Sequence, residues 1–198
     1  MGKSHGAGLM DTMVVLVILG LTLAIVAPNL GRVRQTVDLR RLGRQVATDA
    51  MLCRMAALTS SRRVGLIFAR EADRLFYCMV EDRDLDGVSR RDYVAGVDKP
   101  VSPRRWVAFL SGSAQLGVPD WGVPDPSGRG TLAPDDGLRL GDAAIMSFSP
   151  QAHATPSTVY FHDGRERMVA VRVAGRDGRI RVLEWQRGWL RWHDLKGY

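Results

Sequence analysis

The chain begins with an apolar segment, GAGLMDTMVVLVILGLTLAIVAPNL at residues 6–30. No charged side chain occurs from Thr12 to Leu30, and a helix of that length can cross a hydrocarbon core of roughly 30 Å. One acid, Asp11, stands at the start of the run, after the polar leader MGKSHG. Because a carboxylate at a membrane boundary is costly unless it finds a partner, Asp11 indicates a functional role.

Three kinds of N-terminal segment could explain this pattern. A cleaved secretory signal needs a small-residue cleavage site after its apolar core, and PNLGR at residues 28–32 contains no A-x-A site. A plain membrane anchor explains the length and leaves the acid and the proline incidental. A prepilin-type signal is cut before the apolar run, which stays on the mature protein as an assembly helix.

The spacing of these residues resembles that of type IV pilins and pseudopilins. Gly6 is similar to the family's cleavage-site glycine and Ala7 to its N-methylated first residue, and Asp11 then falls on the family's acid at the fifth mature position. Gly8 is a rival cleavage site that would move the acid to the third position. The sequence departs from the family in having Ala rather than Phe first, and Asp rather than Glu as the acid.

The resemblance implies how such a helix assembles. Prepilin peptidase would cleave between Gly6 and Ala7, and other pseudopilins or pilins would contact the mature helix. The amino group of a neighbouring subunit would neutralise Asp11 and set the axial register of the filament. Gly20 and Pro28 fall on the family's glycine and proline positions, and Pro28 is expected to kink or locally melt the helix because it lacks a backbone N–H.

The remainder of the chain has the composition of a globular protein, with 45% hydrophobic and 25% charged residues and a net charge of +7 carried mainly by arginine. We expect four parts: a leader at 1–6, a transmembrane assembly helix at 7–30, a periplasmic half of the same helix at 31–61, and a β-rich domain at 62–198. An apolar stripe at steps of three and four residues supports the second half of the helix; its members are Leu39, Leu42, Val46, Ala50, Cys53 and Ala57.

Short β-branched and aromatic runs predict the strands of the last part. They are VGLIF (64–68), LFYCMV (75–80), YVAGV (93–97), WVAFL (106–110), AIMSF (144–148), STVYF (157–161), MVAVRVA (168–174) and RIRVLEW (179–185). A long loop is expected at about 112–142. The predicted fold class is therefore α+β, with a long N-terminal transmembrane and assembly helix packed on an antiparallel β-sheet globular domain.

The C-terminal half narrows the resemblance. FSPQAHATPSTVYFHDG at 148–164 and GRIR at 178–181 resemble the C-terminal sheet of the minor pseudopilin H and FimT group. This implies a minor pseudopilin of the type II secretion pseudopilus, involved in protein export. It would be a single-pass protein of the bacterial inner membrane, with its C-terminal domain in the periplasm.

The alternative is a FimT-like minor pilin that binds DNA for uptake through a type IV pilus. Arg179 and Arg181 would lie on one face of a strand, where their guanidinium groups could hold phosphates. A solvated basic face that meets neighbouring subunits explains the same residues.

Two further patterns are compatible with more than one structure. Asp82, Asp84 and Asp86, followed by a glycine, resemble the first half of a calcium loop, and they equally fit a solvated acidic turn. Cys53 and Cys78 could form one disulfide in an oxidising periplasm or stay as two buried thiols.

Enzyme signatures are missing from the sequence. It has no G-x-S-x-G, P-loop, H-E-x-x-H or paired C-x-x-C pattern, and its four histidines are isolated. We therefore expect a protein that is not an enzyme, with no cofactor apart from the calcium considered above.

Overall fold

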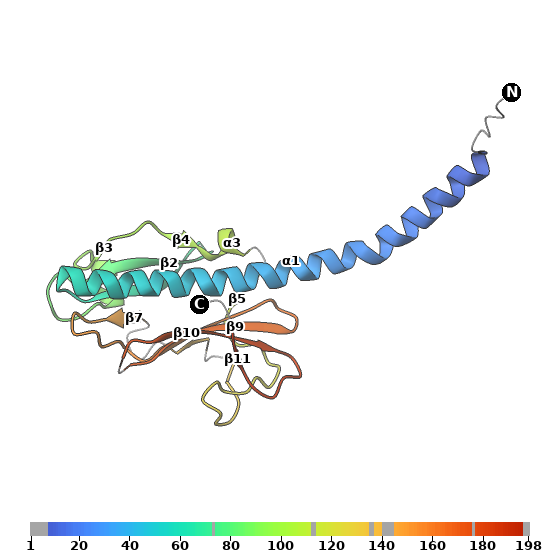
Figure 1. Cartoon of the computed structure of the whole chain (residues 1–198). Helices are drawn as coiled ribbons and strands as arrows, with labels where there is room; N and C mark the ends of the chain where they lie inside the picture. Colours follow the sequence, from blue (N-terminus) through green and yellow to red (C-terminus); the bar gives the residue numbers. More distant parts are fainter. Residues whose placement is uncertain are drawn as a thin grey trace. The chain divides into compact units, whose positions relative to one another are not determined.

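The computed structural model describes residues 8–72, 74–111, 114–134, 137–139, 145–175 and 177–195. The chain divides into two compact units, Met1–Gln35 and Thr36–Tyr198. Helix α1 (Leu9–Ser60) runs from the first unit into the second (Figure 1). The second unit also contains the short helices α2 (Arg90–Ala95) and α3 (Val107–Leu110) and all the strands.

The strands of the second unit form two antiparallel sheets. The first sheet has the order β3-β2-β1-β7, with β4 also paired to β2; the second has the order β11-β10-β9-β8-β5, with β6 also paired to β8. The strands of the first sheet are β1 (Val64–Glu71), β2 (Arg74–Glu81), β3 (Lys99–Pro100), β4 (Arg105–Trp106) and β7 (Ile145–Phe148). Those of the second are β5 (Gln115–Leu116), β6 (Leu138–Arg139), β8 (Ser157–His162), β9 (Arg167–Val173), β10 (Ile180–Gln186) and β11 (His193–Asp194).

The main hydrophobic core joins the second half of α1 to both sheets. Leu42 and Val46 of the helix belong to one buried cluster with Phe68 of the first sheet and Val169 and Val171 of the second. Every member of the three buried clusters lies at residue 39 or later. Among the described residues, the Thr36–Tyr198 unit contains every member of the core, so we expect it to fold without the first unit.

Two buried acids tie the helix to the sheets. Asp49 accepts a hydrogen bond of 2.8 Å from the Tyr77 hydroxyl and forms an ion pair of 3.1 Å with Arg105, both from the first sheet. Glu184 of β10 bonds both Arg40 of α1 and Arg167 of β9 at 3.0 Å. Because each acid has its polar partners, these charges are satisfied inside the core.

The predicted fold class is wrong on two points. The strands form two separate sheets, and the helix does not pack on a sheet along its whole length, because among its described side chains the buried ones begin at Leu39. Among the residues that the structure describes, no helix is long and apolar enough to cross a membrane. The physical reason for the limited packing is the residue pattern of α1. Its apolar residues form a stripe on one face only from Leu39 onward, whereas from Thr12 to Leu30 they occupy all sides of the helix.

Most of the predicted strands are confirmed, with ends shifted by at most three residues. YVAGV at 93–97 is an exception and contributes to helix α2. The Ser89 side chain caps this helix by accepting from the backbone N–H of Asp92, and Gly96 ends it at φ 76°. WVAFL at 106–110 is the other exception, because only Trp106 is in a strand and α3 follows directly.

A buried histidine makes the stability of the second unit depend on pH. His162 ends β8, and its Nδ1 accepts a hydrogen bond of 3.0 Å from the backbone N–H of Gly164. Burial lowers its pKa, an effect that Asp163 partly opposes. The unfolded chain therefore takes up the proton more readily, so this contribution to stability is present above the ordinary pKa near 6.5 and is lost as the pH falls below it.

We expect the melting temperature of the unit to fall between about pH 7 and pH 5, and His162→Gln to reduce that fall. His153→Gln, at an exposed position, is the matched control and should leave the pH dependence as it is. Thermal melts followed by circular dichroism provide the measurement. Equal pH dependence in wild type and His162→Gln would contradict this assignment.

Candidate functional site

The N-terminal motif is only partly within the described structure. Gly6 and Ala7 lie outside the described residues. Asp11 is in the first turn of α1, and its backbone N–H donates to the Gly8 carbonyl at 2.8 Å. Helix α1 continues through residue 28, so the expected local melting at Pro28 is not found.

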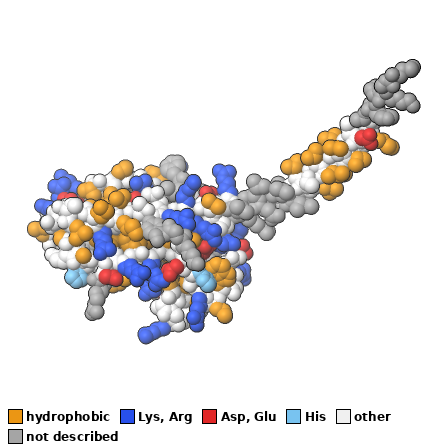
Figure 2. All heavy atoms as spheres, in the orientation of Figure 1, with side chains coloured by type: hydrophobic (Ala, Val, Ile, Leu, Met, Phe, Trp, Pro, Cys, Tyr) orange, Lys and Arg blue, Asp and Glu red, His pale blue; other side chains and the backbone are white. Residues whose placement is uncertain are grey.

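The described part of the first unit carries an exposed apolar helix surface. The exposed large hydrophobic side chains from Met10 to Leu23 have exposed fractions between 51% and 81%. Figure 2 shows hydrophobic side chains along this stretch of α1. Within this stretch the Thr22 hydroxyl donates back to the Ile18 carbonyl at 2.9 Å. A helix that is apolar all round is stable when other apolar groups cover it.

The second sheet carries a polar groove of about 690 Å³ on the face turned away from α1. Strand register places Thr158, Arg172 and Arg181 side by side across β8, β9 and β10. Arg179 lies just before β10 and lines the same groove. The structure thus brings together Arg179 and Arg181, as their alternation predicts, and adds Arg172 and Thr158 through strand pairing.

One of these arginines already has a carboxylate partner. Arg181 Nε donates to Asp194 Oδ1 at 3.0 Å, and Arg181 Nη2 bonds the second oxygen, Oδ2. This hydrogen bonding raises the pKa of Arg181 and lowers the pKa of Asp194. Sequence reasoning missed Asp194, since only the pairing of β10 with β11 reveals its position.

The acidic loop brings its three predicted carboxylates together. One ligand atom each of Asp82, Asp84 and Asp86 lies within 4.8 Å of the others. Asp82 is buried and accepts from the backbone N–H of Leu85 at 2.7 Å, whereas the other two are exposed. A hydrogen bond that the protonated Asp86 carboxyl donates to Asp84, with the repulsion of neighbouring acids, raises the pKa of Asp86. A calcium loop takes its last carboxylate ligand from its twelfth position, which counted from Asp82 is Tyr93 in α2. The acid one residue earlier, Asp92, accepts a hydrogen bond from the Ser89 hydroxyl. Calcium binding therefore stays a prediction.

The two cysteines are free and buried. Cys53 belongs to the core between α1 and the sheets, while Cys78 belongs to a separate cluster with Ile67 and Val80. Tyr77, its neighbour in β2, is in the core with Cys53. Since successive strand side chains point to opposite faces, Cys78 is directed away from the helix that carries Cys53.

Comparison of the chain with protein-family models, with curated proteins and with solved structures gives no match. The resemblance to pilin-like proteins therefore stays a prediction from the residue patterns at the two ends of the chain.

Proposed function

We propose that this protein is a minor pseudopilin, a structural subunit of a type II secretion pseudopilus. The observation that carries the proposal is the uncovered apolar helix of the first unit, joined to a folded unit with its own core. Each large side chain of that helix gains about 1.5–3 kcal/mol when an apolar surface covers it fully. Equivalent helices of other pseudopilins supply such a surface in a filament.

The proposal includes the steps before assembly. Prepilin peptidase cuts the precursor between Gly6 and Ala7, and the new amino terminus is methylated. The precursor is held at the bacterial inner membrane, with the Thr36–Tyr198 unit on the periplasmic side. Asp11 then meets the amino terminus of a neighbouring subunit, which offsets the cost of an unpaired acid in apolar surroundings.

Mass spectrometry of the mature N-terminus tests the cleavage. We expect a chain that begins at methylated Ala7 after co-expression with a prepilin peptidase. Gly6→Val should block the cut, and Gly8→Val, the matched control at the rival position, should leave it in place. A mature chain that begins at any other residue would overturn this assignment.

Asp11→Ala should leave cleavage intact and reduce incorporation into pseudopili by about tenfold or more, because the paired acid is lost from apolar surroundings. Asp11→Glu should restore incorporation, since it keeps the charge. Incorporation is measured by quantifying the subunit in sheared filaments, with Asp38→Ala, an acid later in α1, as control. Normal incorporation of Asp11→Ala would count against the proposed role of the acid.

A second candidate function, DNA binding by a type IV minor pilin, is favoured by the groove that Arg172, Arg179 and Arg181 line. Guanidinium groups hold phosphates through paired hydrogen bonds. Asp194 competes with a phosphate for Arg181, because it occupies the same donors.

Gel-shift assays of the Thr36–Tyr198 unit at physiological salt test this second candidate. Arg179→Ala and Arg181→Ala should weaken binding and reduce its salt dependence, since each removes a phosphate contact. Asp194→Asn should strengthen binding by freeing Arg181. Arg74→Ala, an exposed arginine of the first sheet, is the control. Absence of binding, or binding that these groove variants do not change, would rule out this use of the groove.

A further inference from the structure

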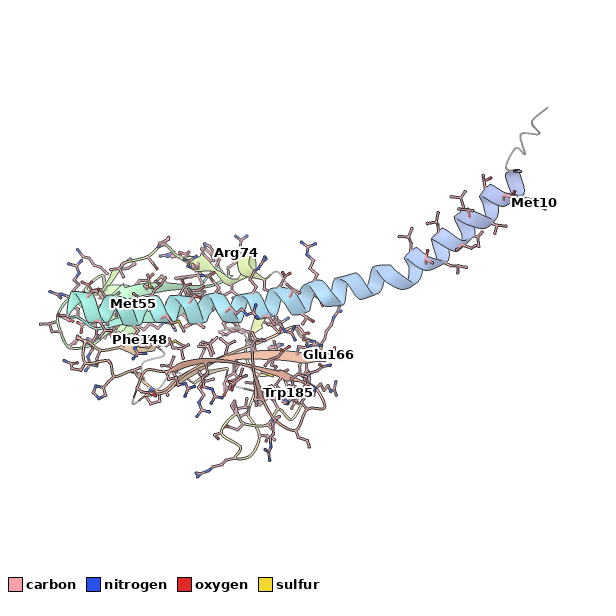
Figure 3. The ribbon with its side chains drawn as sticks, viewed as in Figure 1. Met10, Met55, Arg74, Phe148, Glu166 and Trp185 are labelled. Carbon is pink, nitrogen blue, oxygen red and sulfur yellow. The ribbon has the colours of Figure 1, made fainter. Side chains whose placement is uncertain are left out.

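One end of the Thr36–Tyr198 unit is built from two neighbouring loops of the second sheet, residues 163–166 and 187–192; we call it the loop end. Helix α1 and strand β10 run in opposite directions along each other. A Cβ on Gly178 would lie 3.5 Å from Arg54 Nε, a Cβ on Gly43 would lie 3.3 Å from Val182, and Arg40 bonds Glu184. Residues after Glu184 therefore lie at the end where the unit's helix begins. Figure 3 shows Glu166 at the opposite end of the unit from Met55.

Hydrogen bonds hold the two loops of this end together. The backbone N–H of Arg187 donates to the Glu166 carbonyl at 2.7 Å. Trp185 Nε1 donates to the Trp189 carbonyl at 2.8 Å, which anchors the second loop to β10. This support presents Leu190 outward, with 92% of the residue exposed.

Positive charge surrounds this apolar tip. Arg165, Arg187 and Arg191 are all exposed. Of the nearby acids, Glu184 is buried between two arginines. Asp163 accepts hydrogen bonds from the backbone N–H groups of residues 165, 166 and 167 through one oxygen. Glu166 is the exposed acid of these two loops, so their balance is positive.

We propose that the loop end is a contact surface for an anionic lipid bilayer, with Leu190 inserted among the headgroups and the flanking arginines bound to lipid phosphates. An exposed apolar side chain flanked by basic residues favours a bilayer surface, where anionic headgroups lie over an apolar acyl layer. Nucleic acid offers the anions without the apolar layer, so it leaves Leu190 unexplained. The inference rests on the proposed function, which brings the N-terminal segment, and with it the start of this unit, to a membrane.

Sedimentation with vesicles tests the contact. The Thr36–Tyr198 unit should bind vesicles of mixed phosphatidylglycerol and phosphatidylcholine and not vesicles of phosphatidylcholine alone. Arg187→Gln and Arg191→Gln should each weaken binding about fivefold. Leu190→Ser should weaken it by a similar factor, whereas Leu85→Ser, an exposed leucine in the acidic loop, should not. Thermal melts establish that the variants are folded.

Four results would overturn the inference: no binding, equal binding to both kinds of vesicle, equal effects of Leu190→Ser and Leu85→Ser, or binding of duplex DNA that the Leu190 and arginine variants weaken to the same extent. The mature N-terminus is measured separately. If the mature chain starts at Ala7 but the Thr36–Tyr198 unit does not bind vesicles, the lipid contact alone is contradicted. If the chain is cut elsewhere, the proposed function is contradicted.

Discussion

We expect Gly43→Val to destabilise the Thr36–Tyr198 unit by about 3 kcal/mol or more, enough to unfold a marginally stable domain. A Cβ at this buried position would overlap Val169 Cγ1 of β9 and lie 3.3 Å from Val182 Cγ1 of β10. The helix therefore approaches the second sheet at a distance that only glycine allows. Urea denaturation of the isolated unit gives the free energy of unfolding.

A double-mutant cycle identifies the cause of this effect. Gly43→Ala should cost about 1–3 kcal/mol from overpacking, which outweighs the gain of about 1 kcal/mol in helix propensity. Val169→Ala removes the overlapping methyl group, so the two changes together should cost less than the sum of the single changes. Leu52→Val, at an exposed position of α1 inside the same unit, is the control. Strict additivity would exclude close packing at Gly43 as the reason.

The second large effect is expected for Glu184→Ala, which should cost about 2–3 kcal/mol. Loss of one partner of a buried ion pair usually costs about 3–5 kcal/mol. The value here is lower because the side chains of Arg40 and Arg167 keep 39% and 21% of their surface exposed. Both arginines would lose their carboxylate inside the contact between α1 and the second sheet.

Glu166→Ala, at the exposed neighbouring acid, should change stability by less than about 0.5 kcal/mol. A triple variant, with Arg40 and Arg167 changed to methionine and Glu184 to leucine, should recover most of the loss, because apolar replacement of a whole buried ionic group is often neutral. Urea denaturation provides the measurement. Glu184→Ala with the stability of Glu166→Ala would show that the ionic contact contributes little.

The local pattern of hydrophobic and β-branched residues was enough to predict most strands. It failed where the capping residues of a helix determine the secondary structure. VGLIF, STVYF and MVAVRVA have the branched and aromatic residues of buried strands, and the structure confirms them. YVAGV at 93–97 has a similar composition, yet its first three residues are helical. The Ser89 cap begins helix α2 before them, and the positive φ of Gly96 ends it after them. Hydrophobic composition alone cannot distinguish these cases, because YVAGV reads as a strand although α2 buries none of its residues.

The candidate groove was likewise only partly predictable from the sequence. Alternation along one strand predicts that Arg179 and Arg181 share a face, and both line the groove. Arg172 and Thr158 join them through strand register, and Asp194 reaches Arg181 because β11 pairs with β10. Register depends on contacts between distant residues, so no local pattern contains it.

The sequence by itself determined the apolar stripe from Leu39 to Ala57 and most of the strands, because each follows from the local period of side chains. Only the tertiary structure decided that the strands divide into two sheets and that Leu190 stands exposed among arginines. These features depend on which elements far apart in the sequence pack together. Packing of the whole core determines this, rather than the residues adjacent in the chain.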